Sequence, residues 1–155
     1  MPLSRSLLVD FALLLALILI GVMGYKLSPL LLPKADVTVN PVAGCDLQVG
    51  ACSALLPGGG RLSFALLPRP IPPALPLEVV VDIEGASADQ VAVDFAGVSM
   101  AMGYNRPVLA SAGPGRFAGQ VTLPVCVTGR MTWQATVLVE TGRTRVAVPF
   151  QFEAG

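Results

Sequence analysis

An almost unbroken apolar run near the N-terminus sets the plan of this 155-residue chain. The run covers residues 7–24 and contains one charged side chain, Asp10. As a helix that rises ~1.5 Å per residue it would be roughly 27 Å long, close to the ~30 Å hydrocarbon core of a bilayer. The run therefore predicts one transmembrane helix, and the remaining residues, about 120 of them, suffice for a single domain.

The residues on either side of this helix bear on its orientation in the membrane and on whether it is cleaved. Arg5 precedes the run and Lys26 and Lys34 follow it, so the distribution of basic residues favours neither orientation strongly. A cleaved signal peptide is the alternative, but the run is longer than a typical h-region and no A-x-A site directly follows it. Pro29 and Pro33 disfavour continuation of the helix. We expect a single-pass protein of the bacterial inner (cytoplasmic) membrane with four parts: a cytoplasmic N-terminus (1–6), a transmembrane helix (7–25), a proline-containing stalk (26–36) and a periplasmic domain (37–155).

Charge and composition exclude several classes of function. Ten basic residues balance ten acidic ones, and no Lys/Arg cluster occurs, so the basic patch of a nucleic-acid-binding protein is missing. The chain has no histidine, which removes the commonest general base and the usual zinc ligand. We therefore expect a protein that is not an enzyme and does not bind nucleic acid.

The part after the stalk has the pattern of an all-β domain. Short apolar or alternating runs, bounded by Gly, Pro and Asp, recur about every ten residues. Seven such runs predict an immunoglobulin-like antiparallel β-sandwich preceded by the one N-terminal transmembrane helix. The predicted strands are residues 36–40, 61–67, 77–84, 90–95, 115–123, 131–140 and 145–152.

Three cysteines suggest one disulfide and one free thiol. Cys45 and Cys52 enclose six residues that include Gly50, so the chain can bring the two cysteines within bridging range. We interpret the pair as a structural disulfide. A redox or metal-binding role is the alternative, but the pair lacks the C-x-x-C spacing of thiol oxidoreductases, and Asp46 argues against a lowered thiol pKa. Cys126 is then left unpaired.

Sulfur-bearing side chains provide a candidate metal site. A two-residue hairpin turn at residues 128–129 would set Cys126 opposite Met131. Met100 and Met102 share one face if their segment is extended. Soft sulfur ligands without imidazole select Cu(I). The alternative is that these residues simply pack in the core, as methionine and cysteine commonly do.

Residues 100–139 resemble the YtkA-like and FixH-like families of membrane-anchored bacterial proteins. The family pattern is a Met-x-Met or Met-Gly cluster, then G-x-[YF]-x-G, a strand and G-x-W. Here three residues, not one, separate the last glycine from the tryptophan, and the cysteines are additional. The matching residues are Met100, Met102 and Gly103, then Gly115, Phe117 and Gly119, and finally Gly129 and Trp133.

The resemblance implies an immunoglobulin-like sandwich behind one transmembrane helix. It also implies a role in copper delivery or in maturation of haem-copper respiratory oxidases. The partner would be an inner-membrane complex, such as a respiratory oxidase or a copper transporter. Together with the sulfur spacing described above, the resemblance supports Cys126, Met131, Met100 and Met102 as the predicted Cu(I) ligands.

Two other functions stay open at this point. The chain could be a non-catalytic structural or interaction subunit of a membrane complex without metal, or, ranked last, a thiol-redox protein that uses Cys45 and Cys52. Trp133 and Phe117 are expected in the hydrophobic core in every case. Arg106 and Arg130 are expected on a solvated rim beside the methionines.

Overall fold

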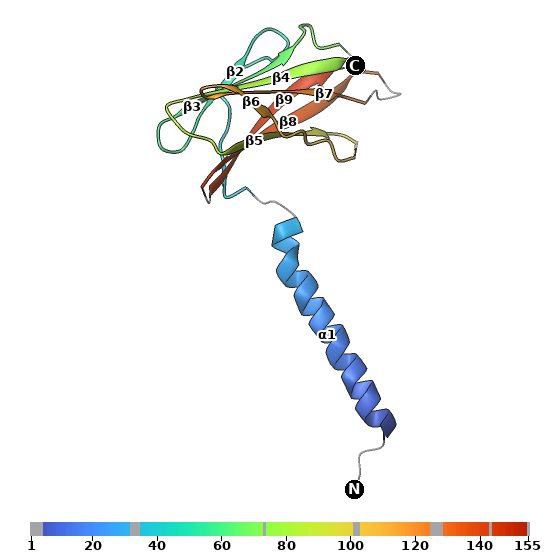
Figure 1. The fold of residues 1–155 in the computed structure, drawn as a ribbon. Helices are drawn as coiled ribbons and strands as arrows, with labels where there is room; N and C mark the ends of the chain where they lie inside the picture. The colour runs from blue at the N-terminus through green and yellow to red at the C-terminus, as the bar shows by residue number, and fades with distance from the viewer. Residues whose placement is uncertain are drawn as a thin grey trace. The chain divides into compact units, whose positions relative to one another are not determined.

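The computed structural model describes residues 5–31, 35–72, 74–100, 103–124, 129–142 and 144–154. The side chains of residues 5–8 and 26–31 are outside this description. The chain divides into two compact units, Met1–Lys34 and Ala35–Gly155. The first unit is helical and the second is built of strands (Figure 1).

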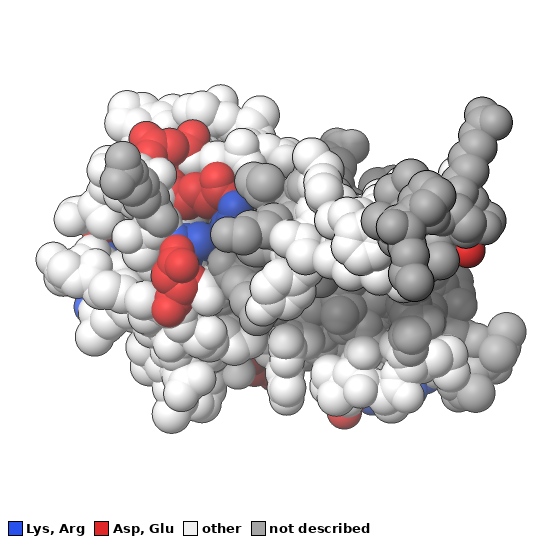
Figure 2. Space-filling view, turned by 90° about the horizontal axis from the view of Figure 1, so that it is seen from below, with Lys and Arg blue, Asp and Glu red and all other residues white. Residues whose placement is uncertain are grey.

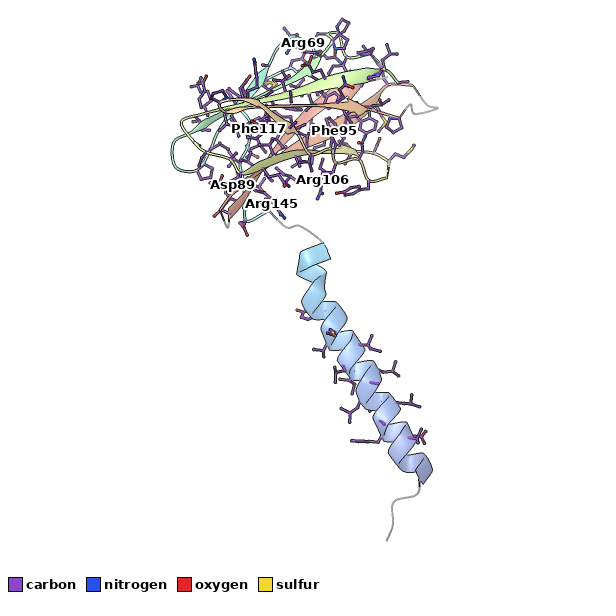
Figure 3. All side chains as sticks on the ribbon, viewed as in Figure 1. Arg69, Asp89, Phe95, Arg106, Phe117 and Arg145 are labelled. Atoms are coloured by element: carbon purple, nitrogen blue, oxygen red, sulfur yellow. A yellow bond between two sulfur atoms is a disulfide. The ribbon has the colours of Figure 1, made fainter. Side chains whose placement is uncertain are left out.

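Helix α1 (Arg5–Leu31) is the one helix among the described residues. The expectation that Pro29 stops the helix is wrong, because α1 runs two residues past it. A proline lacks its own N–H donor, but the N–H groups after it can still bond to carbonyls one turn back. Large apolar side chains from Val9 to Tyr25 are exposed on all sides of α1 (Figure 3). No helix within the described residues is both long enough and apolar enough to cross a membrane.

The second unit is a sandwich of two β-sheets (Figure 1). One sheet has four strands in the order β1-β9-β8-β5, and the other has five in the order β2-β3-β4-β7-β6. All pairs are antiparallel except β1 with β9, which is parallel. The predicted all-β sandwich is therefore confirmed. The strands are β1 (Val37–Thr38), β2 (Cys52–Leu55), β3 (Arg61–Leu67), β4 (Pro76–Glu84), β5 (Gln90–Gly97), β6 (Ala110–Gly113), β7 (Arg116–Thr122), β8 (Met131–Thr141) and β9 (Thr144–Ala154).

Two strands of the sandwich were not predicted. The seven predicted runs correspond to β1, β3, β4, β5, β7, β8 and β9. In β2 the inward side chains are small, Cys52 and Ala54, so the run lacks the large β-branched residues that mark a strand. In β6 all four residues are exposed, so no apolar alternation marks it. Both strands are held by their neighbours, β3 and β7, more than by their own sequence.

The core lies between the two sheets. Alternate side chains of β3 and β4 are buried, as expected for strands with one face inward. Phe64 of β3 contacts Phe150 of β9, with ring centroids 5.1 Å apart. Trp133, on the central strand β8, is 2% exposed, and Phe117 is partly buried against the same core.

A small second cluster lies on the outer face of the four-stranded sheet. Ala92, Leu138 and Ala147 are buried there, and Ala35 packs against them. Ala35 is the first described residue of the sandwich unit. The entering chain therefore covers part of the outer face before β1 begins.

Candidate interaction surface

The predicted sulfur ligands lie partly outside the described residues. Met102 and Cys126 are not described. Met131 starts β8, is 7% exposed and belongs to the hydrophobic core, whereas Met100 is 45% exposed. The described parts of the chain contain no group of three or more His, Cys, Asp or Glu side chains that could hold a metal ion. Convergence of the four sulfurs stays a prediction.

The predicted hairpin turn at residues 128–129 also falls partly outside the described residues. Gly129 has φ +90°, a conformation that suits a turn. The strands before and after it, β7 and β8, belong to different sheets. Met131 pairs with Ala154 of β9. The connection from β7 to β8 therefore crosses between sheets, unlike a hairpin, which keeps both strands in one sheet.

The cystine closes a short loop at one edge of the sandwich. Cys45 and Cys52 are paired, with Cα atoms 5.5 Å apart. Cys52 is buried in β2, and Cys45 is exposed. Inside the loop the Asp46 carboxylate accepts a hydrogen bond from the Gln48 N–H at 2.9 Å. The pair joins the loop to the core, as expected of a structural disulfide.

The connection between β5 and β6 is held along the free edge of β5. The Val93 N–H donates to the Pro107 carbonyl at 3.1 Å, and the Phe95 N–H donates to the Asn105 carbonyl at 2.9 Å. The Leu109 N–H donates to the Val91 carbonyl at 2.8 Å. These bonds fix residues 105–109 as an extra short edge segment before the chain enters β6 in the other sheet. The backbone of this connection is thus preorganised.

The same connection exposes large apolar side chains. Tyr104 is 81% exposed, Val108 60% and Val98 54%. We call these three residues, together with Met100 and Arg106, the Tyr104 surface. Aromatic, methionine and arginine side chains are enriched where proteins bind each other. A fixed backbone lowers the entropy cost of binding through such side chains.

Arg106 links this surface to β5. Its Nε lies 3.2 Å from Oδ1 of Asp94, and both side chains are partly buried. Its Cζ lies 5.3 Å from the centre of the Tyr104 ring (Figure 3 labels Arg106). Hydrogen bonding to Asp94 raises the pKa of the Arg106 guanidinium, and partial burial opposes that effect. The guanidinium therefore stays charged at neutral pH and supports the tyrosine ring through a cation–π contact.

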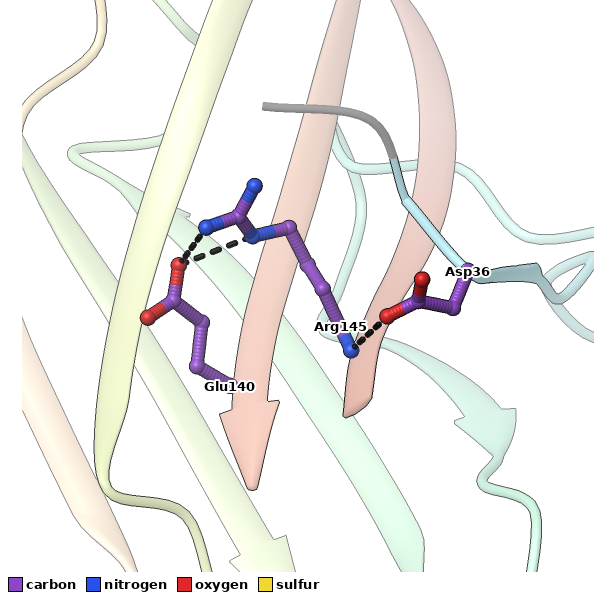
Figure 4. Close-up of polar contacts among 3 residues, drawn as sticks. All are labelled: Asp36, Glu140 and Arg145. Atoms are coloured by element: carbon purple, nitrogen blue, oxygen red, sulfur yellow. Dashed lines mark hydrogen bonds and ion pairs between the residues drawn. The ribbon is translucent and has the colours of Figure 1, made fainter. Parts of the chain in front are cut away.

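A second polar cluster lies where the chain enters the sandwich. Figure 4 shows Arg145 between Glu140 and Asp36. The Arg145 Nε donates to Glu140 at 2.8 Å, and the Arg145 backbone N–H donates to the Asp36 carboxylate at 2.7 Å. The Asp36 carboxylate thus helps to hold the start of β1 to β9, and the Glu140 carboxylate joins β9 to β8. On the face seen in Figure 2, acidic atoms surround a few basic ones, and no broad basic patch is visible among the coloured residues.

The Tyr104 surface was only partly recognised from the sequence. The sequence singled out Met100 and Arg106 but not Tyr104. The available signal was an aromatic residue placed between Gly103 and Asn105, two residue types that favour turns. An aromatic side chain in a turn has little core to enter and is often exposed for binding.

No protein-family model, curated protein or solved structure matches this chain.

Proposed function

We propose that this chain is a non-catalytic binding module that docks a partner protein through the Tyr104 surface. The observation that carries the proposal is a hydrogen-bonded β5–β6 connection with strongly exposed Tyr104, Val108 and Val98. Isolated exposed apolar residues are ordinary, but here Val108 belongs to the fixed segment 105–109, and Tyr104 directly precedes it and contacts a charged, partly buried arginine. This is the interaction-subunit function among the alternatives.

The strand order supports an immunoglobulin-like scaffold for this module. Strands β3, β4, β7 and β6 follow one another in one sheet, and β5, β8 and β9 in the other. In chain order this corresponds to the A-B-E-D and C-F-G sheets of the seven-stranded immunoglobulin arrangement, with β1 and β2 added. Domains of this type commonly bind through connections between strands.

We also propose that α1 anchors the module in a membrane. The support is the surface of residues 9–25, which is apolar on all sides apart from Asp10 and would be unfavourable in water. Alkaline carbonate extraction of cell membranes is the measurement. The full chain should stay in the membrane pellet, and the double variant Leu14→Arg/Leu17→Arg should shift to the supernatant. Release of the unaltered chain would contradict the anchor.

A photo-crosslinker placed at residue 104 of the full chain in cells tests the docking surface. We expect one crosslinked product of defined mass, and Arg106→Ala should reduce it because the ring loses its support. The matched control is the crosslinker at Leu55, which is 61% exposed on β2. The same product from both positions, or no product at 104, would contradict the proposal.

Copper handling remains the alternative prediction from the sequence. It requires Cys126 to bind Cu(I) together with methionine sulfurs. Met131 lies in the core, so its use as a ligand would require opening that part of the sandwich. A Cu(I) titration of the full chain, with Cys126→Ser as control, separates the two functions. Tight binding that is lost in the serine variant would favour copper handling.

A further inference from the structure

The edge strand β9 is covered along only a small part of its length. β1 pairs with Val146 and Ala147, and the Val39 N–H donates to the Ala147 carbonyl at 2.9 Å. The chain then leaves this sheet, because the Val42 N–H donates to the Ser53 carbonyl of β2 in the other sheet at 2.8 Å. Among the described residues, no strand pairs with β9 on this side beyond Ala147.

The backbone groups that face this open edge can be assigned from the pattern of β9. The carbonyls of Arg145 and Ala147 accept hydrogen bonds from this side, and so does that of Glu153. Backbone groups alternate in direction along a strand, so the intervening odd-numbered residues face the same side. Gln151 therefore presents both its N–H and its carbonyl to the open edge. Pro149 presents only a carbonyl, because proline has no N–H.

Both ends of the open stretch are closed by the chain itself. Val39 occupies one end, at Ala147, and the Gln48 side chain closes the other by donating to the Glu153 carbonyl at 2.5 Å. The same Gln48 side chain accepts a hydrogen bond from the Ile71 N–H at 2.8 Å, which holds it in place. Six residue steps of ~3.3 Å separate Ala147 from Glu153, so the opening is roughly 20 Å long.

A cavity of about 370 Å³ lies against this opening. Its lining includes no charged side chain, so a charged ligand would lose water without gaining an ionic partner. The Gln151 side-chain Nε2 donates to the Gln134 side-chain Oε1 at 3.5 Å, so one side of the cavity is polar and uncharged. The cavity is lined by Asn40, Pro41, Val42, Ala43, Gly44, the Cys45–Cys52 pair, Gln134, Pro149, Phe150 and Gln151.

We propose that this cavity binds a short extended polypeptide segment of a partner protein, added as a strand to the edge of β9. The segment would continue the position that β1 occupies at Ala147. Recognition is through the main chain, because the lining offers backbone donors and acceptors and no charge. The proposal is independent of the Tyr104 surface, which lies at the opposite edge of the same sheet.

Selected peptides provide the probe for this site. A random heptapeptide library is selected against the full chain in detergent, and one selected peptide is synthesised with each backbone nitrogen methylated in turn. We expect methylation at alternate positions to weaken binding about tenfold or more, since it removes the donors that pair with β9. Methylation at the positions between them should have a much smaller effect.

Two variants of the protein complete the test. Gln151→Pro removes the N–H that faces the open edge. The hydrogen bonds of β9 to β8 are made by the even-numbered residues and are kept, so peptide binding should fall about tenfold. Gln151→Ala keeps that N–H and should bind within about threefold of the unaltered chain. Tyr104→Ala should leave the affinity unchanged, which separates this site from the Tyr104 surface.

Three outcomes would overturn the proposal. They are failure to select any peptide, unaltered binding by Gln151→Pro, and equal tolerance of methylation at every position. The last would identify a side-chain pocket for a small polar molecule in place of a strand-binding edge. The methylated peptides leave the protein unchanged, so this measurement remains decisive even if Gln151→Pro does not fold.

Discussion

The two edge strands of the four-stranded sheet that carry the candidate sites, β5 and β9, are covered by other parts of the chain in different ways. At the β5 edge, residues 105–109 cover the strand with three backbone hydrogen bonds, and Val108 within this segment and Tyr104 just before it have exposed side chains. At the β9 edge, β1 covers two residues and the chain then moves to the other sheet. The first edge offers side chains on a fixed backbone, and the second offers backbone groups. The path of the covering segment therefore decides which kind of recognition each edge can support.

The largest expected effect comes from the strand that lies between the two edges. Trp133 of β8 pairs with Gly97 of β5 on one side and Phe152 of β9 on the other, and its ring is buried. Trp133→Ala should lower the free energy of unfolding by about 3–5 kcal/mol, because it leaves a large cavity between both edges. Urea unfolding measures this change. Trp133→Phe is the control and should lower the free energy of unfolding clearly less. A loss below about 1 kcal/mol for Trp133→Ala would show that the Trp133 ring does not stabilise the strands on either side of it.

The next effect is confined to the β9 side. Cys45→Ser removes the disulfide while replacing an exposed side chain. The chain-entropy relation for so short a loop predicts a loss of about 2–3 kcal/mol in the free energy of unfolding. Amide hydrogen exchange should quicken in the loop and at the β9 edge but not in residues 105–109. Equal quickening at both edges would contradict their independence.

A matched pair of side-chain amides compares the two edges directly. Gln48→Ala loses two hydrogen bonds, to the Glu153 carbonyl and from the Ile71 N–H, and should cost about 1–3 kcal/mol. Asn105→Ala loses one exposed bond, to the Thr122 carbonyl, and should cost about 0.5–1.5 kcal/mol. Thermal unfolding of both variants measures the difference. A larger loss for Asn105→Ala would contradict the expectation that Gln48 contributes more to the free energy of unfolding than Asn105.

The smallest expected effect on stability is that of Asp94→Asn. It removes a partly exposed ion pair with Arg106 and should cost at most about 1 kcal/mol. The pKa of Arg106 is raised in the folded protein, so the ion pair's contribution to the free energy of unfolding is fully present below the pKa of the unfolded chain and is lost only as pH rises through the higher folded pKa, far above neutral pH. Urea unfolding should therefore give the same difference in free energy of unfolding between the unaltered chain and Asp94→Asn at pH 7 and at pH 9. A change in that contribution between these two pH values would contradict the pairing.

Most strands could be predicted because their residues alternate. β3 was predicted at its observed bounds, and β4, β8 and β9 differ from their predictions by at most two residues at either end. β2 and β6 could not be found, since small or fully exposed residues give no apolar period and their pairing is decided by distant strands. The extent of α1 was underestimated because one proline near a helix end removes a single donor.

The candidate sites were harder to predict than the fold. Tyr104 is exposed because residues 105–109 pair with β5, and this long-range contact has no local sequence signal. The open edge at Gln151 depends on the chain leaving β9 after Val39, which again is a property of the path and not of Gln151. The disulfide was more accessible to prediction, because the short spacing of Cys45 and Cys52 limits their separation in any fold.

The parallel pairing of β1 with β9 also determines how the sandwich carries tension. A pull between the chain entering at Ala35 and the chain leaving at Ala154 draws the two strands past each other in opposite directions. The hydrogen bonds that join them, including those of Asp36 and Val39 to β9, lie across the pull and are stretched together. A hairpin opened from its free ends would break its bonds one at a time. The entrance to this domain is therefore a shear clamp, which gives mechanical resistance at the point where a tether would load it.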